Sequence, residues 1–334
     1  MRHLVLLLLA ATSTASAATW TVDDDGPADF TSINDAIQAA SNGDTIQVAA
    51  GVYEETYVYA WATGILHIDR SVTIVGAGPG RTVVRQAPHS ATHAGAITTA
   101  AGTWNTVIEG MTLINDRCGS QGNNAACTAV FETDYYNVTS GSLDIHHVVF
   151  QLPLNRAKAI HYRNNAGLAV TYDHVTVDFG DERSGDICYT NRGMTNSVFR
   201  NGIVINGNTT CEIHSGSALP FQYTVYDGPS APSGTGNFVG QPTFVDRDGG
   251  DYSPAPGSVA IDAGDPAETD ADGSVPDLGA YFRRQLGCPA NHPEVERNGV
   301  PVCLHAGALV DPSAAVGELA VIGDGAFIAP RAVI

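Results

Sequence analysis

Short apolar runs separated by a polar pair recur through residues 105–227 of the chain. The runs are rich in Val, Ile, Thr, Tyr and Phe, the residue types that favour strands, and Gly, Asn and Asp lie between them. The comparable positions, separated by 37, 27, 23 and 27 residues, are Gly110, His147, His174, Ser197 and Thr224. Periods of about 20–50 residues are typical of solenoids, whose units bury their apolar faces only when they are stacked.

Short strands, tight turns and this period describe one coil of a parallel β-helix. The region resembles the right-handed parallel β-helices of the pectin-lyase-like group. We therefore predict an all-β fold, a right-handed parallel β-helix solenoid. Residues 88–104 and 118–127 are expected to form loops that project from it.

The segment before the repeats predicts a cap for the solenoid. Thr31 or Ser32 can cap a short helix, and the helix would cover the open end of the β-helix. Its apolar face would be Ile33, Ala36, Ile37 and Ala40. This block resembles the beginning of pectin methylesterases, but their Gln-Ala-Val stretch is absent. Residues 177–181 (Val-Asp-Phe-Gly-Asp) match only a shortened form of their Asp-Phe-Ile-Phe-Gly stretch, so we do not take esterase as the leading interpretation.

Two further segments follow the repeats. Residues 238–281 resemble the closing signature of secreted bacterial β-helix proteins, with an insertion after Pro254. A six-residue period then pairs a small residue with a β-branched residue two positions later, beginning at Ala308 and Val310. It resembles the hexapeptide repeat of left-handed β-helices, but fewer than two coils are present. Because the period stops at Ile334 in mid-repeat, we expect a truncated product or a tail that docks onto something, and this tail could support an oligomer.

These observations divide the chain into four parts. Residues 1–17 read as a signal peptide, with a short apolar core and an Ala-Ser-Ala cleavage site. Residues 18–286 would be the β-helix domain, 287–305 a linker and 306–334 the partial hexapeptide segment. We therefore expect a secreted or cell-surface protein without a membrane span.

The composition limits the possible partners. The chain of 334 residues has a formal charge of −19, which argues against nucleic acid and anionic membranes as ligands. An acidic polysaccharide would need a bridging cation. Six cysteines in a secreted chain predict disulfides. Six cysteines allow 15 pairings, of which the sequence favours the local ones, Cys118–Cys127, Cys188–Cys211 and Cys288–Cys303.

An acidic cluster in the closing segment is a candidate calcium site. Asp-x-Asp-Gly places two carboxylates on one side of a sharp turn, and calcium prefers such oxygen ligands. The alternative is that these residues only form turns. The candidate ligands are Asp262, Asp265, Asp270, Asp272 and Asp277. The run of Asp23, Asp24 and Asp25 is a weaker version of the same pattern.

A polar column on the repeats is the second candidate. Equivalent positions of successive coils stack one strand spacing apart, so His147 would lie over His174 with Asp173 beside them. These three could act as an acid–base group. The alternative is a column whose polar groups only satisfy one another.

Lys158 and Arg163 form the third candidate. Polysaccharide lyases with this fold use a Lys or Arg base beside a calcium-bound uronate, and the resemblance implies that chemistry only as a class. Lys158 could equally be a solvated side chain.

The sequence supports two interpretations of function, since a fold does not dictate one. The first is a non-catalytic protein for adhesion or for binding an extracellular polysaccharide or cell-surface glycan. The alternative is a polysaccharide-active enzyme, a calcium-dependent lyase before a glycoside hydrolase. The 16 basic residues are scattered along the chain, which favours the first interpretation because a lyase needs several cations on one face.

Overall fold

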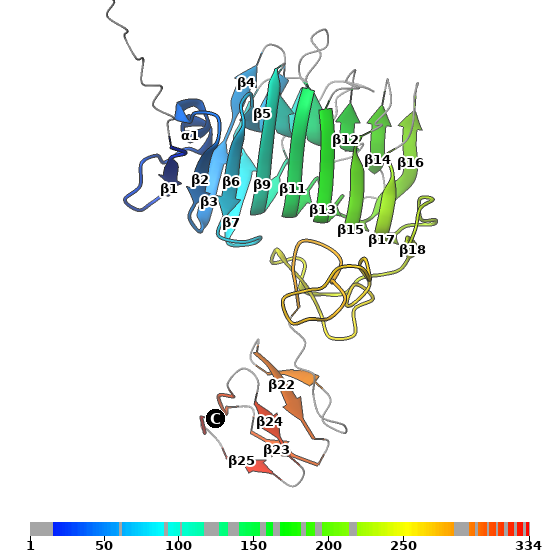
Figure 1. Ribbon diagram of the computed structural model, residues 1–334. Coiled ribbons are helices and arrows are strands. Elements are labelled where there is room, and N and C mark those ends of the chain that lie inside the picture. Colours follow the sequence, from blue (N-terminus) through cyan, green and yellow to red (C-terminus); the bar gives the residue numbers. More distant parts are fainter. Residues whose placement is uncertain are drawn as a thin grey trace, which may run out of the picture.

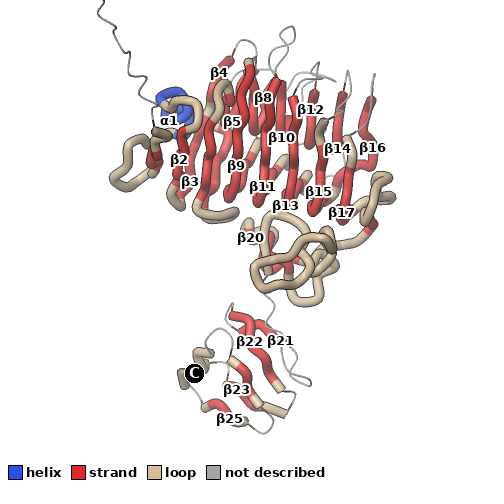
Figure 2. Tube along the Cα trace, in the orientation of Figure 1, coloured by secondary structure: helices blue, strands red, loops and turns tan. Residues whose placement is uncertain are grey.

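The fold is all-β with one short helix, and two sheets stacked from coil to coil form its body (Figures 1 and 2). The computed structural model describes residues 16–334 except residues 60–61, 90–92, 101, 117–126, 133–139, 154–157, 163–167, 182–184, 191–195, 214–218, 284–293, 298–299, 306, 312, 317–319, 324–325, 330–331 and 334. The predicted signal peptide lies almost wholly outside the described residues. Within them, no helix is both long and apolar enough to cross a membrane.

The first sheet has eleven strands, and its main path follows the order β1-β2-β6-β9-β11-β13-β15-β17-β18 with every pairing parallel. Strands β3 and β7 pair beside this path. Its strands are β1 (Thr19–Val22), β2 (Asp44–Val48), β3 (Gly51–Glu55), β6 (Val72–Gly76), β7 (Thr82–Gln86), β9 (Thr103–Ile114), β11 (Ser140–Gln151), β13 (Leu168–Asp178), β15 (Val198–Ile205), β17 (Phe221–Asp227) and β18 (Phe238–Val239).

The second sheet has seven strands in the order β16-β14-β12-β10-β8-β5-β4. Its strands are β4 (Tyr57–Tyr59), β5 (Ala62–Ile68), β8 (His93–Thr99), β10 (Cys127–Glu132), β12 (Lys158–Tyr162), β14 (Gly185–Thr190) and β16 (Gly207–Ile213). From β9 onward the chain alternates between the sheets, so the predicted parallel β-helix is confirmed. The prediction of a loop over residues 88–104 is wrong, because this stretch contains β8, whose Ala96 and Ile97 are fully buried.

The register of the coils explains the core. Equivalent side chains of successive coils lie directly above one another. One buried column runs from aliphatic to aromatic residues along the stack, and no member is more than 2% exposed. Its members are Ile46, Ile74, Ile108, Ile145, Tyr172, Phe199 and Phe221. Repeating large apolar side chains at one position buries a continuous core, which no single coil could do.

The helix α1 (Ile33–Ala39) is the predicted cap of the β-helix. The side chain of Ser32 accepts a hydrogen bond from the backbone N–H of Asp35, as an N-cap residue does. The buried carboxylate of Glu55 accepts another from the backbone N–H of Ile33 at 2.5 Å. Ile33 and Ile37 are fully buried, so the helix adds its apolar face to the core at the first coils.

The segment after β18 lies against the outer face of the first sheet. It includes the antiparallel pair β19 (Phe244–Asp246) and β20 (Asp251–Pro254). Side chains of β11, β15 and β17 that point away from the coil interior form a second apolar cluster with this segment. The buried members are Val149, Ile203, Ile205, Val225, Tyr252, Ala260, Leu278 and Ala280. We call residues 240–283 the closing segment.

The C-terminal tail is a small unit with its own apolar cluster. Its strands are β21 (Glu294–Arg297), β22 (Val300–Leu304), β23 (Leu309–Val310), β24 (Val321–Ile322) and β25 (Phe327–Ile328). Leu309 pairs with Phe327, and Cys303 pairs with Val321, so positions three hexapeptides apart lie side by side. The segment predicted as a linker contains β21 and β22, because Val302 is needed to complete the cluster around Val316 and Ile322.

Candidate functional site

Two polar clusters lie on the first sheet, and strand β13 contributes to both. Asp173 and His174 belong to the first cluster, and Asp178, at the end of the strand, belongs to the second. The closing segment contacts each of them through charged side chains. The same outer face therefore carries both groups of residues with chemical potential.

In the first cluster, the predicted histidine column is present. The rings of His147 and His174 are stacked, with their centroids 5.1 Å apart and an angle of 3° between their planes. Asp173 Oδ1 lies 3.0 Å from His174 Nδ1. His147 and His174 have φ of 52° and 51°, a left-handed conformation that turns the strand and is uncommon for residues other than glycine.

Further contacts fix Asp173 and connect it to the closing segment. Arg200 donates to Asp173 Oδ2 at 2.6 Å and to Glu268 Oε1 at 2.6 Å. Asn201 donates to the same two carboxylates at 3.1 Å. Burial acts to raise the pKa of Asp173, but the hydrogen bond and charge of His174 and the charge of Arg200 outweigh it and hold this pKa below its ordinary value.

The environment of His147 differs from that of an ordinary surface histidine. Desolvation between the coils, followed by repulsion from His174 and His146, lowers the pKa of His147, although the residue itself is exposed. A histidine held by a carboxylate can act as a general base. The described cavity on this sheet, however, is lined by neither histidine, and the members of the cluster bond chiefly to one another.

The continuation of this column was predicted wrongly. Asp173 pairs with Arg200 in the next coil, so Arg200 and Asn201 occupy the positions predicted for Asn196 and Ser197. Tyr223, at φ 46°, takes the place predicted for Thr224. The sequence offers two polar pairs, one on each side of Val198 and Phe199. The structure uses the second pair because this buries Phe199 between Tyr172 and Phe221.

The structure does not bring Lys158 to the histidines. Lys158 begins β12 of the seven-stranded sheet, where its backbone pairs with Thr128 and Asp186. His147 and His174 belong to the other sheet. The side chain of Lys158 and the whole of Arg163 lie outside the described residues.

The predicted calcium ligands stabilise turns of the closing segment. Asp277 accepts hydrogen bonds from the backbone N–H groups of Asp262 at 2.9 Å and Arg283 at 2.7 Å. Asp270 in turn accepts one from the N–H of Asp277 at 2.9 Å. Burial is the main cause that raises the pKa of Asp277 to about 6, and it also raises the pKa of Asp270.

The other two members of the set serve local turns in the same way. Asp265 accepts from the N–H of Ala267, and Asp272 accepts from the N–H of Ser274. In the part of the chain that the structure describes, three carboxylates bring ligand atoms within 4.8 Å of one another only at Asp23, Asp24 and Asp25. Calcium binding at the predicted set therefore stays a prediction.

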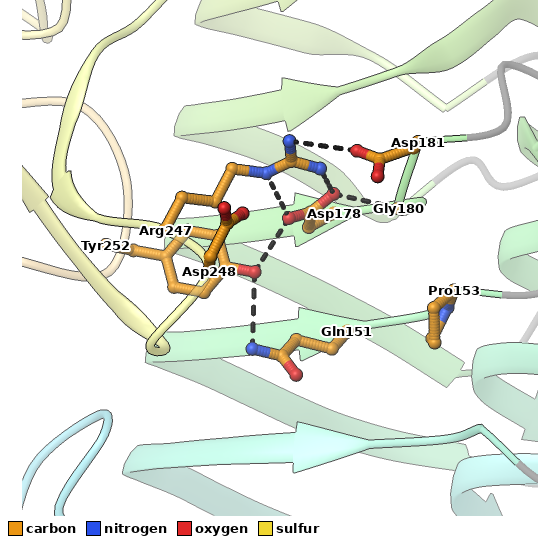
Figure 3. A pocket seen from close by; sticks show the side chains of 8 residues that line it. All are labelled: Gln151, Pro153, Asp178, Gly180, Asp181, Arg247, Asp248 and Tyr252. Atoms are coloured by element: carbon orange, nitrogen blue, oxygen red, sulfur yellow. Dashed lines mark hydrogen bonds and ion pairs between the residues drawn. The ribbon is translucent and has the colours of Figure 1, made fainter.

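The second cluster lines a cleft of about 410 Å³ between the first sheet and the closing segment (Figure 3). Asp178 lies at its wall with a side chain only 5% exposed. Gly180, at φ 73°, turns the chain directly after it, a conformation that glycine adopts readily. The lining residues are Gln151, Pro153, Asp178, Gly180, Asp181, Arg247, Asp248 and Tyr252.

Four donors fix the carboxylate of Asp178. Arg247 donates from Nε and Nη2, both at 2.8 Å, Tyr252 donates from its hydroxyl at 2.7 Å, and the backbone N–H of Gly180 donates at 2.8 Å. Gln151 donates from Nε2 to the Tyr252 hydroxyl at 3.2 Å. Hydrogen bonding to Asp178 raises the pKa of Arg247, and burial followed by the charge of Asp178 raises the pKa of Tyr252.

Gln151 and Asp178 occupy one stacked position on neighbouring coils. The cleft thus joins an anionic carboxylate, a cation and an amide, and the first two are in direct contact. The sequence gave a partial signal for it, the Val-Asp-Phe-Gly-Asp stretch at residues 177–181. Nothing local could have indicated Arg247 and Tyr252, which lie about seventy residues further along the chain.

No protein-family model matches the sequence, and no curated protein matches it either. Two of the solved structures similar to this chain are pectin methylesterases. The enzyme from Aspergillus niger has 12% sequence identity and a TM-score of 0.38, over 68% of this chain and 84% of that one. The enzyme from Erwinia chrysanthemi has 14% identity and a TM-score of 0.31, over 69% and 83%. Likeness at this level assigns no activity to the chain.

Proposed function

We propose that this protein is an extracellular polysaccharide-active enzyme and that the cleft around Asp178 is its active site. The observation that carries the proposal is the carboxylate of Asp178, which Arg247 holds at the wall of an open cleft with the Gln151 amide on the preceding coil. The cleft volume of about 410 Å³ falls within the range of about 300–1,000 Å³ typical of ligand pockets.

Hydrolysis of an ester substituent is the reaction that suits these groups best. Asp178 would attack the carbonyl carbon of the ester, and an N–H of Gln151 would stabilise the developing oxyanion. The bond to the alcohol then breaks, and the alcohol leaves with a proton taken from water. The hydroxide formed in this way attacks the acyl–aspartate, which releases the carboxylic acid and restores Asp178.

The other polysaccharide reactions fit these residues less well. A glycosidase needs a carboxylic acid kept protonated by apolar surroundings, whereas Asp181 and Asp248 are exposed side chains. A lyase needs a base for a carbon acid, and its predicted base Lys158 begins a strand of the other sheet. The resemblance of the N-terminal block to pectin methylesterases supports an ester as the substrate linkage.

The test is an activity panel on methyl-esterified and O-acetylated polysaccharides. Release of methanol or acetate by the full chain is expected. Asp178→Asn should lower the rate by at least about a hundredfold, because it removes the nucleophile. Asp35→Asn, an exposed residue of α1, is the charge-matched control and should keep full activity. Unsaturated product that appears only with calcium would instead establish a lyase.

Non-catalytic glycan binding is the second candidate. One observation favours it: Arg247, Tyr252 and Gly180 already donate four hydrogen bonds to Asp178, which reduces its power as a nucleophile. Under this candidate the esterified glycans would bind without any release of methanol or acetate. Asp178→Asn would then change the affinity but no rate.

A further inference from the structure

The charged groups of the cleft are unequal in number. Three of its described lining residues are aspartates and one is an arginine. Desolvated charges of one sign favour a ligand of the opposite sign. The question is which of these groups remain able to contact a ligand.

Arg247 is already engaged by protein carboxylates. Its Nε and Nη2 bind Asp178 at 2.8 Å, and its Nη1 lies 3.4 Å from Asp181 Oδ1. A guanidinium with each nitrogen directed at a carboxylate has little capacity left for the carboxylate of a uronate. Among the described lining residues there is no second cation.

Asp181 and Asp248, in contrast, keep acceptor capacity. The Asp181 side chain is 94% exposed, and only its Oδ1 faces Arg247. Asp248 is exposed at the opposite side of the cleft, on the turn between β19 and β20, and Figure 3 shows its carboxylate beside Arg247. Each carboxylate can accept several N–H donors.

We propose that the cleft selects a polysaccharide with protonated amino groups, a polymer of amino sugars, through Asp181 and Asp248, and that it discriminates against uronates. The proposal rests on the proposed function for the position of the site. A sugar ammonium supplies three donors and a positive charge that these carboxylates can accept. The formal charge of −19 over the chain acts in the same direction because it repels polyanions at low ionic strength.

The experiment compares three oligosaccharide probes by calorimetric titration of the full chain in calcium-free buffer, below the pKa of the sugar amine. The probes are oligomers of glucosamine, of N-acetylglucosamine and of galacturonate. The glucosamine oligomer should bind most tightly, and added salt should weaken its binding. Asp181→Asn and Asp248→Asn should each weaken it about two- to fivefold, as expected for an exposed ion pair. Asp35→Asn, which changes the total charge equally, should leave it unchanged.

Two results would overturn the inference. One is equal or tighter binding of the galacturonate or N-acetylglucosamine oligomer. The other is glucosamine binding that Asp181→Asn, Asp248→Asn and Asp35→Asn reduce to the same degree, since this would show attraction by the whole chain alone. Failure of the proposed function is a separate result, because it consists of no ester hydrolysis that depends on Asp178. Binding is measured independently of turnover, so the two failures are distinguishable.

Discussion

At the scale of single residues, Asp277 predicts a specific dependence of stability on pH. Burial raises its pKa in the folded protein to about 6 from the ordinary value of 3.8. The folded state therefore keeps a proton that the unfolded chain releases, and stability should fall as the pH rises from about 4 to about 6. Asp277→Asn should remove this decline, although it also loses an acceptor for one of the two backbone N–H groups.

The measurement is the free energy of unfolding in urea at a series of pH values across this window. Asp35→Asn serves as the control for the change in net charge, because the −19 chain also loses stability through repulsion as carboxyl groups ionise. Equal slopes in the parent and Asp277→Asn would contradict the assignment to Asp277.

The residues of the two clusters differ in how far the sequence could predict them. His147, His174 and Asp173 come together as the repeat suggested, because one spacing of 27 residues fixes their alignment. Arg200 was missed because the next coil contains two polar pairs. Gln151 has no neighbouring motif, and its role depends on Tyr252, about a hundred residues away. Contacts of that range follow from tertiary packing and leave no periodic signal.

At the scale of elements, the left-handed positions of the first sheet predict unequal effects of substitution. His147 is exposed at φ 52°. Asn tolerates this conformation and Val does not. His147→Asn should leave the free energy of unfolding within about 0.5 kcal/mol, and His147→Val should lower it by about 1–2 kcal/mol.

Urea denaturation of both variants checks this prediction. The equivalent pair of substitutions at His146, one residue earlier and in the same strand, is the control, because His146 lacks positive φ. A similar loss for Val at both positions would show that side-chain packing, and not backbone conformation, sets the cost.

The elements themselves were only half predictable. The first sheet follows from its apolar runs, whose β-branched and aromatic residues alternate in and out of the core. The second sheet was missed, since several of its strands consist of small and polar residues, as in His93–Thr99. These residues form strands because the neighbouring coils supply hydrogen-bond partners on both sides. The tertiary stack thus overrides a weak local preference.

At the scale of the whole molecule, the tail should unfold separately from the β-helix. The buried part of its apolar cluster consists of Val302, Val316 and Ile322, whereas the β-helix core runs through most of the stack. Cys303 is buried and disulfide-bonded, and its bonding partner lies outside the described residues. Cys303→Ser should destabilise the tail by about 2–4 kcal/mol.

Hydrogen exchange followed by mass spectrometry separates the two units. In Cys303→Ser, amides of β22 and β24 should exchange faster, and those of β11 and β13 should keep their protection. Faster exchange throughout the chain would show that the tail and the β-helix unfold together.

The stacking of Gln151 on Asp178 also has a consequence for how such a protein can evolve. Each coil is one rung of a ladder, and adding a rung costs little because the new strands find the same neighbours above and below. A duplication between these two residues would preserve the fold and every buried column. It would also carry Gln151 one rung further from Asp178 and Tyr252, so the cleft would lose its amide. Inheritance of the ladder and inheritance of the chemistry are therefore independent, and lineages with this architecture can keep the first while they lose the second.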